Sequence, residues 1–326
     1  MPAEIKSSIF LPYVVYSFYI GSVFPPWEGS AAEGRCLPDF CDKQDVRCGM
    51  TYLKAILMGL VQGVAEFLPI SSSGHLAIAR NLLNMEGAGA IPEFFDVLLH
   101  LGTLIAVFAA YWRDICDMVV EFFRGIGDLA RHSTPTPVPP ARRLVLLIVI
   151  GTLPLFAVLP IRKAVQGLGD NMYFVGAALI CTGILLFLCD RVRKGHKTER
   201  NARWTDALLV GVGQAVATLP GVSRSGMTIT AGCFVGYERR FAVRFSFLLS
   251  IPAVLGANIL SIKDAAAAGI NGAEVPMYLV GVAVAAATGY LCIRLLKFIA
   301  EKGRFGAFAY YCWAVGVLTL VLQGIK

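Results

Sequence analysis

Charged residues are scarce in this sequence. They make up 16% of the 326 residues, whereas hydrophobic residues make up 56%. A soluble chain of this length carries roughly 25% charged residues, because it needs a solvated surface around its core. The deficit excludes a disordered protein, a nucleic-acid module and an ordinary cytosolic enzyme.

The nine cysteines also lack a recognisable pattern. Six of them lack the spacing of a metal site and lie in or beside apolar segments, where cysteine acts as a small packing residue. We therefore expect no disulfide framework among these six. They are Cys116, Cys181, Cys189, Cys233, Cys292 and Cys312.

The apolar residues are concentrated in long runs. Six runs of about 16–22 residues are each long enough to cross a bilayer as a helix. They are Phe95–Trp112, Leu144–Ile161, Tyr173–Cys189, Phe241–Ile262, Pro276–Ile293 and Ala307–Leu322. The sequence therefore predicts an all-α polytopic membrane protein with six transmembrane helices.

Two further apolar segments, 52–83 and 207–233, are interrupted in the middle by Pro, Ser and Gly. Irregular backbone at membrane depth persists only where protein or a water-filled cavity satisfies its polar groups. Each segment is thus predicted to form a re-entrant helix hairpin. Pro69 and Pro220 are sufficient to break the two helices.

Lysine and arginine predict the orientation. The segments 113–143, 191–203 and 294–306 are rich in these residues, whereas the other two connections carry only Arg162 and Lys163, or Lys263. Under the positive-inside rule, both ends of the membrane domain then face the non-cytoplasmic side. The net charge of +7 is mainly a topology signal, so no nucleic-acid partner is expected.

The first 49 residues are a separate N-terminal extension to the membrane domain, 50–326. They contain one short apolar stretch, Ile9–Pro25, and three cysteines. An export signal is one interpretation. The favoured alternative is that the native protein begins at Met50, directly before the first hairpin.

The two interrupted segments are similar to each other. GLVQGVAEFLPISSSGHLAIA from Gly59 and GVGQAVATLPGVSRSGMTITA from Gly211 share eight of 21 positions without a gap, at an offset of 152 residues. We infer a duplication, with repeat 1 at about 50–190 and repeat 2 at about 205–326. Each repeat has one hairpin and three spans, so the second is inverted relative to the first. Inverted repeats with broken helices commonly form a binding site near the midplane.

The candidate functional residues lie in the two turns. A Gly- and Ser-rich turn that opens a helix offers N–H groups, hydroxyls and a favourable dipole to an oxyanion such as phosphate. Buried membrane charges are costly and usually functional, which singles out a carboxylate and a guanidinium. The first segment supplies Glu66, Ser71, Ser72, Ser73 and His75, and the second supplies Ser223, Arg224, Ser225 and Thr228.

Several of these polar residues also have structural interpretations. Ser73 and Ser225 are as well explained by close packing or helix capping as by substrate contact. His100, inside a span, is interpreted as an interhelical hydrogen bond rather than a catalytic group. For Arg244, a snorkelling or structural role and a substrate contact remain equally open.

From Met50 onward, about 85% of the chain resembles the bacterial undecaprenyl-diphosphate phosphatases associated with bacitracin resistance. The resemblance rests on the Q-x-x-x-E element Gln62–Glu66 running into LPISSSGH at 68–75, and on PGVSRSGMT at 220–228. The family pattern allows Glu or Gln at the first position. Here it is Gln62, which leaves Glu66 as the only carboxylate of that element.

The resemblance implies hydrolysis of undecaprenyl diphosphate to the monophosphate and inorganic phosphate in the bacterial inner membrane, with a divalent cation, Mg²⁺ or Ca²⁺, as cofactor. The implied partners are the polyprenyl diphosphate lipid and membrane lipid, and a homodimer is allowed. The implied catalytic residues are Glu66, Ser72, His75 and Arg224. The implied phosphate-binding residues are Gln62, Ser71, Ser73, Ser223, Ser225 and Thr228, and Glu66 is the candidate metal ligand.

Under this hypothesis Ser72 attacks the terminal phosphorus, Glu66 or His75 takes its proton, and Arg224 stabilises the transferred phosphoryl group. The main alternative is an inverted-repeat transporter or flippase of a phosphorylated polyprenyl lipid. A second class of membrane lipid phosphatases needs a histidine after its Ser-Arg pair. No histidine follows His196, which excludes that class.

Overall fold

The computed structural model describes residues 50–82, 91–132, 137–268, 274–302 and 305–325. The expectations for the N-terminal extension lie outside these residues. Within the described ranges the chain is helical and forms no multi-residue strand, as expected for an all-α protein. The helices are α2 (Tyr52–Phe67), α3 (Ser72–Leu82), α4 (Ile91–Ala110), α5 (Trp112–Ala130), α6 (Pro140–Thr152), α7 (Arg162–Gly167), α8 (Met172–Arg191), α9 (Trp204–Val216), α10 (Arg224–Phe234), α11 (Arg239–Ala268), α12 (Val275–Lys302) and α13 (Gly306–Ile325).

Within the described ranges, five helical segments are long and apolar enough to cross a membrane, and a sixth is obtained if a bent pair counts as one span. That pair is α4 and α5, which meet at an angle of 85°. Many large apolar side chains on these helices are exposed, among them Leu279, Leu291 and Leu318. An apolar exterior of this extent is unfavourable in water but suits lipid, so the chain is a multi-span integral membrane protein.

One predicted span has a different local structure. The run Leu144–Ile161 begins as α6, but the α-helix ends at Thr152 and continues as short 3-10 segments. Pro154 and Pro160 lie in those segments. Because proline has no N–H to donate and its ring clashes with the preceding turn, a regular α-helix cannot continue through this region.

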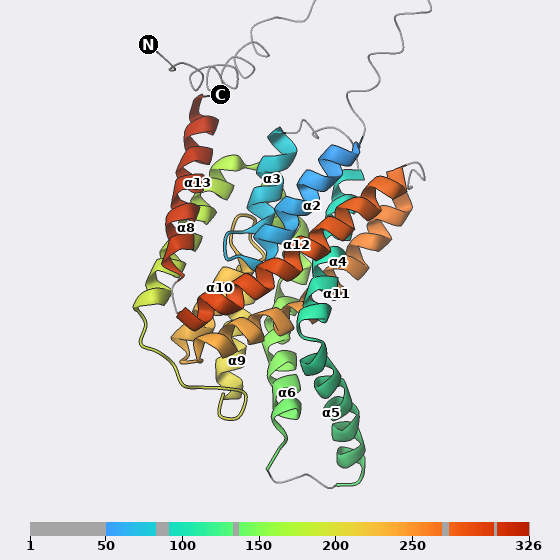
Figure 1. Ribbon diagram of the computed structural model, residues 1–326, viewed down its shortest axis with the longest axis vertical. Coiled ribbons are helices and arrows are strands. Elements are labelled where there is room, and N and C mark those ends of the chain that lie inside the picture. The colour runs from blue at the N-terminus through green and yellow to red at the C-terminus, as the bar shows by residue number, and fades with distance from the viewer. Residues whose placement is uncertain (1–49, 83–90, 133–136, 269–273, 303–304, 326) are drawn as a thin grey trace, which may run out of the picture. The chain divides into compact units, whose positions relative to one another are not determined.

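Both interrupted segments form pairs of helices joined by short turns. The first pair is α2 and α3, and the second is α9 and α10; in each pair the two helices pack on each other. Figure 1 shows the two pairs entering from opposite ends of the helical bundle, with their turns near its middle. α2 and α9 begin 152 residues apart, at Tyr52 and Trp204, and α3 and α10 have the same length and the same offset.

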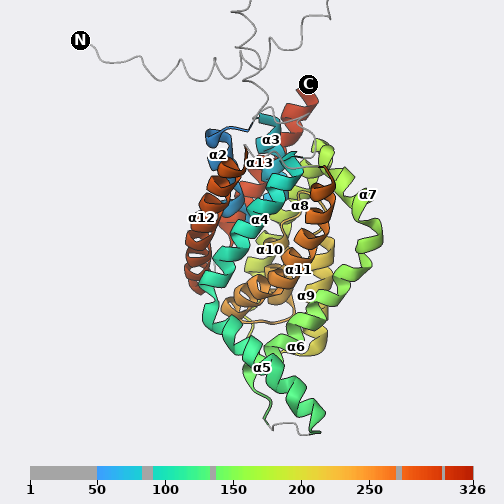
Figure 2. The same ribbon diagram turned by 90° about the vertical axis from the view of Figure 1, so that its right-hand side faces the viewer.

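The longer helices hold these pairs in place. α2 packs on α12, α9 packs on α6, and α8 packs on α13. α4 contacts both α12 and α11, and it lies between them in Figure 2. The buried core includes Phe67, Phe245 and Phe247, so the first turn is anchored against α11 by aromatic packing.

Very close helix contacts occur at matching glycines of the two pairs. A Cβ atom at Gly59 would lie 2.5 Å from the carbonyl oxygen of Gly281 on α12. A Cβ atom at Gly211, the equivalent position at the 152-residue offset, would lie 2.2 Å from the carbonyl oxygen of Gly151 on α6. Both positions therefore need glycine for the same reason, a backbone-to-backbone approach that leaves no room for a side chain.

Candidate active site

The two turns share the same capping hydrogen bonds. In the first turn the Ser71 hydroxyl accepts a hydrogen bond from the Gly74 N–H at 3.3 Å, and in the second the Ser223 hydroxyl accepts one from the Gly226 N–H at 3.0 Å. Both serines are buried. Each turn thus opens a helix whose first N–H groups point into the centre of the protein, an arrangement that favours anions.

The turns are also bonded to each other. The Gly221 N–H donates to the Ser73 hydroxyl at 3.2 Å, and the Ser225 hydroxyl donates to the Leu68 carbonyl oxygen at 3.3 Å. The structural interpretation of Ser73 and Ser225 is therefore supported by their contacts. These bonds bring together two segments about 150 residues apart and fix the distance between the helix N-termini.

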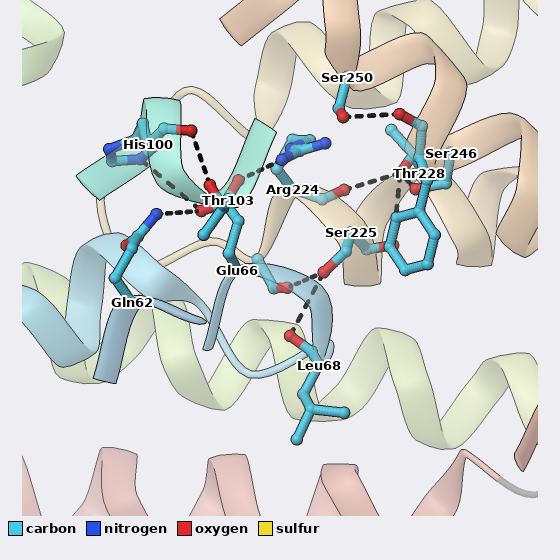
Figure 3. A network of polar contacts seen from close by, with 12 residues as sticks. Gln62, Glu66, Leu68, His100, Thr103, Arg224, Ser225, Thr228, Ser246 and Ser250 are labelled. Carbon is cyan, nitrogen blue, oxygen red and sulfur yellow. Dashed lines mark hydrogen bonds and ion pairs between the residues drawn. The ribbon is translucent and has the colours of Figure 1, made fainter. Parts of the chain in front are cut away.

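A buried ion pair lies where the turns meet (Figure 3). Arg224 Nη2 donates to Glu66 Oε1, and Gln62 Nε2 donates to Glu66 Oε2 at 3.0 Å. The Ser72 side chain lies near the same carboxylate. Glu66 is 7% exposed, so its charge is compensated by these donors rather than by bulk water.

His100 is part of this cluster, although the sequence favoured an interhelical role for it. Its Nδ1 lies 2.7 Å from the Asp96 carbonyl oxygen and its Nε2 lies 3.7 Å from Glu66 Oε2. A carbonyl oxygen only accepts hydrogen bonds, so Nδ1 is the donor in this contact and Nε2 is the ring nitrogen that faces the carboxylate. The sequence feature that could have identified His100 as part of the site is an ionisable side chain inside an apolar run.

A narrow hollow borders the ion pair, and the surrounding side chains leave no free space in it for a water molecule. Its polar lining comes from Glu66, Arg224, Thr103 and Ser250. Arg224 Nη1 is buried and has no hydrogen-bond partner among the described residues. A guanidinium in this state has a donor left for an acceptor that enters the hollow.

Thr228 stabilises the helical turn that carries Arg224. Its hydroxyl contacts the Arg224 carbonyl oxygen at 2.9 Å and the Ser246 hydroxyl at 2.6 Å. Ser246 is fully buried on α11. Thr228 therefore links α10 to α11 and fixes the first turn of the helix that carries Arg224.

His75 lies in different surroundings from Glu66. Its Nε2 is 2.9 Å from the Tyr311 hydroxyl, its Nδ1 is 2.7 Å from the Ser71 carbonyl oxygen, and its ring stacks on that of Tyr311. Because Nδ1 donates to a carbonyl, Nε2 is free to accept from the tyrosine. His75 thus joins α3 to α13, whereas His100 is the histidine beside the carboxylate.

The described residues contain no group of three or more His, Cys, Asp or Glu side chains placed to hold a metal ion. The site does contain the Glu66 carboxylate and the amide oxygen Gln62 Oε1, which is buried and lacks a partner in the described part of the chain. Oxygen ligands of this kind suit Mg²⁺ or Ca²⁺, and Mg²⁺ commonly takes one or two carboxylates plus substrate phosphates.

Comparison with known proteins identifies the family. Residues 55–318 match the family described as bacitracin resistance protein BacA. The chain belongs to the BacA family. Both turns and all the residues discussed above lie inside the matched range.

The match to individual BacA relatives extends over nearly the whole length of each relative. An undecaprenyl-diphosphatase of Methanosphaera stadtmanae is 39% identical over 83% of this chain and 98% of the relative. Those of Methanobrevibacter smithii and Desulfatibacillum aliphaticivorans are 40% and 42% identical, over 83% of this chain in each case and 98% and 99% of the relatives. The family resemblance seen in the sequence motifs is thus confirmed.

Proposed function

We propose that this BacA family member hydrolyses undecaprenyl diphosphate to undecaprenyl phosphate and inorganic phosphate, which recycles a lipid carrier for cell-wall synthesis and confers bacitracin resistance. The observation that carries the proposal is the buried Glu66–Arg224 pair between two anion-favouring helix N-termini. Relatives of 35–42% identity named undecaprenyl-diphosphatase support the same activity.

The architecture proposed for the bacterial inner membrane has six spans and two re-entrant hairpins in an inverted repeat, with both ends of residues 50–326 on the non-cytoplasmic side. The matching bounds of the helix pairs and the paired close contacts at Gly59 and Gly211 support the repeat. The entry of the pairs from opposite ends of the bundle supports the inversion. The distribution of lysine and arginine supports the orientation.

Phosphate recognition is assigned to the two turns. Arg224 Nη1 supplies an unused donor beside the hollow, and the helix N-termini supply N–H groups and their dipoles. The hydroxyls of Ser71, Ser73, Ser223, Ser225 and Thr228 shape this pocket through their hydrogen bonds. The prenyl chain lies along the apolar, lipid-facing helices.

Ser72 is the proposed nucleophile. Its Oγ forms a bond to the terminal phosphorus as the anhydride P–O bond breaks, and undecaprenyl phosphate leaves with the bond electrons. Glu66, near the Ser72 side chain, takes the hydroxyl proton. Water then attacks the phosphoseryl group and releases inorganic phosphate. His100 Nε2 is placed to exchange a proton with Glu66, which supports it over His75 in that role.

Arg224 neutralises charge on the transferred phosphoryl group, where positioning and electrostatics supply most of the acceleration. Glu66 and Gln62 Oε1 are the protein groups that would hold a divalent cation beside this arginine. When bound it adds positive charge beside the phosphate oxygens.

The decisive experiment measures phosphate release from undecaprenyl diphosphate by the purified full-length protein in detergent, with and without a chelator. We expect release by the wild type, and loss of at least about 10³-fold in Ser72→Ala and Arg224→Ala. Arg193→Ala, an exposed arginine outside the site, is the matched control. A Ser72→Ala protein with near-wild-type turnover would overturn the nucleophile in favour of an activated water. A wild type that releases no phosphate would favour the transporter.

A further inference from the structure

A second polar cavity lies away from the two turns. It has a volume of about 360 Å³ and lies between the α4–α5 bend, the start of α11 and the end of α12. Its lining residues are Tyr111, Asp114, Arg240, Val243, Arg244, Lys297, Ala300 and Glu301. One water needs roughly 10–15 Å³ of such space, so the cavity has room for a phosphate group.

Cations outnumber anions in this lining, three to two. The two carboxylates are paired: Asp114 with Arg244 at 2.6 Å and Glu301 with Arg240 at 3.5 Å. Arg244 also reaches Glu199, on the connection before α9, at 3.5 Å. The third cation, Lys297, makes contacts of a different kind.

Lys297 contacts two uncharged groups. Its ammonium donates to the Ala110 carbonyl oxygen at 3.2 Å and lies 3.7 Å from the centre of the Tyr111 ring. Neither contact neutralises the charge, and the carboxylate that lies near enough to act on it, Asp114, is already ion-paired with Arg244. The wall of the cavity therefore carries a cation whose charge a ligand can compensate.

Two of the lining residues carry buried donors that lack partners in the described part of the chain. The Tyr111 hydroxyl and Arg244 Nε have no hydrogen-bond partner among the described residues, and Tyr111 is only 4% exposed. A buried group left without a partner costs about 1–3 kcal/mol. Two unsatisfied donors beside an ammonium that forms no ion pair within the described residues suit a ligand that is an acceptor and an anion.

The cavity is separated from the Glu66 site by aromatic side chains. Phe247 packs edge-on against Phe67, with ring centres 5.4 Å apart, and against Tyr111 at 6.1 Å. The charged rim formed by Arg240 and Glu301 is exposed. It lies near the ends of α11 and α12, beside the basic connections that the sequence places in the cytoplasm.

We propose that this cavity is a second anion site, which binds a phosphate group at the cytoplasmic membrane surface through Lys297, Arg244 and the Tyr111 hydroxyl. The phosphate is carried either by a lipid head group or by free inorganic phosphate. Basic pockets between membrane helices commonly take lipid head groups. This site is distinct from the proposed hydrolytic site and does not depend on its chemistry.

The test uses the full-length protein carrying Glu66→Gln and Arg224→Gln together, which removes the arginine of the hydrolytic site without leaving Glu66 charged and unpaired. Binding of labelled inorganic phosphate is measured by equilibrium dialysis in detergent. Binding of dioleoyl phosphatidic acid, against phosphatidylcholine, is measured by native mass spectrometry. Two variants are then added to this background: Lys297→Gln, which removes the ammonium charge, and Tyr111→Phe, which removes only an oxygen atom.

We expect Lys297→Gln to weaken binding about tenfold and Tyr111→Phe about threefold or more. Lys194→Gln, an exposed lysine on the connection after α8, is the matched control and should bind like the background. Tyr111→Phe also separates ligand binding from folding. Without ligand it should leave thermal stability unchanged or higher, because it deletes an unsatisfied buried hydroxyl, while the stabilisation by added phosphate falls.

The measurements with phosphatidic acid and with inorganic phosphate identify the molecule that carries the bound phosphate group. Binding of phosphatidic acid alone assigns the site to a lipid head group, and binding of inorganic phosphate alone assigns it to the free ion. Binding of both supports the shared phosphate chemistry. Equal binding by the background, Lys297→Gln and Tyr111→Phe would overturn the proposal, as would no binding of either probe.

Discussion

The two turns have the same scaffold but different chemistry. Ser71 and Ser223 make the same capping bond to a glycine N–H, three residues on in each case. The charged residues do not repeat: Thr218 occupies the position equivalent to Glu66, and Arg224 the position equivalent to Ser72. The duplicated hydrogen bonds position both helices, while the carboxylate and the guanidinium each come from one turn. Neither turn alone contains the ion pair.

The largest effect is expected from removing one of the two opposite charges. Arg224→Gln should lower phosphate release by at least about 10³-fold, since a guanidinium that neutralises a transferred phosphoryl group is worth that much or more. It should also destabilise the protein by about 3–5 kcal/mol, because it leaves Glu66 buried without its counter-charge. Turnover and unfolding in detergent are measured on the same preparations.

A double variant separates the two effects. Glu66→Gln combined with Arg224→Gln removes both charges, so stability should recover toward wild type while activity stays lost. If the double variant were as unstable as Arg224→Gln alone, the pair would not be coupled as the structure indicates.

The close glycine contacts provide a test of the symmetry. Gly59→Ala and Gly211→Ala should each lower stability by about 1–3 kcal/mol, since the new methyl meets a backbone carbonyl that cannot move aside. Gly127→Ala on α5 is the control: no atom lies within 4 Å of its Cβ, so it should stabilise the helix by up to about 1 kcal/mol. The comparison fails if only one of the two equivalent positions is sensitive in thermal unfolding.

The turns and their meeting point could be predicted from the sequence because the repeat is free of gaps. Once Ser71 aligned with Ser223 and Ser73 with Ser225, the matching capping hydrogen bonds followed from the residues themselves. The pairing of Glu66 with Arg224 was a natural consequence, because a membrane interior leaves a buried charge few other partners.

The placement of the histidines could not be predicted in the same way. Whether His75 or His100 faces Glu66 depends on how α3 and α4 are rotated about their axes and on which helix each packs against. A single sequence does not determine those contacts. The local structure beyond Thr152 was also missed, because hydropathy identifies the apolar run Leu144–Ile161 but ignores what Pro154 and Pro160 do to a helix.

The two turns also differ in backbone conformation, and this difference should have a smaller effect on stability. Ser71 has φ +75°, in the left-handed region that disfavours a side chain, whereas Ser223 has φ −73°. Ser71→Gly should therefore be stabilising by about 1 kcal/mol, because relief of this strain exceeds the loss of the cap. Ser223→Gly should be destabilising, since it gains only backbone freedom in the unfolded state. Changes of equal sign and size in thermal unfolding would contradict the difference in backbone.

The smallest effect concerns the two hydrogen bonds that join the turns. Ser225 is buried and donates to the Leu68 carbonyl oxygen, whereas Ser73 is exposed and accepts from the Gly221 N–H. Ser225→Ala should cost about 1 kcal/mol, since the Leu68 carbonyl oxygen loses the donor of a part-buried hydrogen bond. Ser73→Ala should cost less, because water can replace an exposed hydroxyl as the acceptor. Thermal unfolding of both variants in the same detergent measures the difference, and a larger loss for Ser73→Ala would show that water does not reach the first turn.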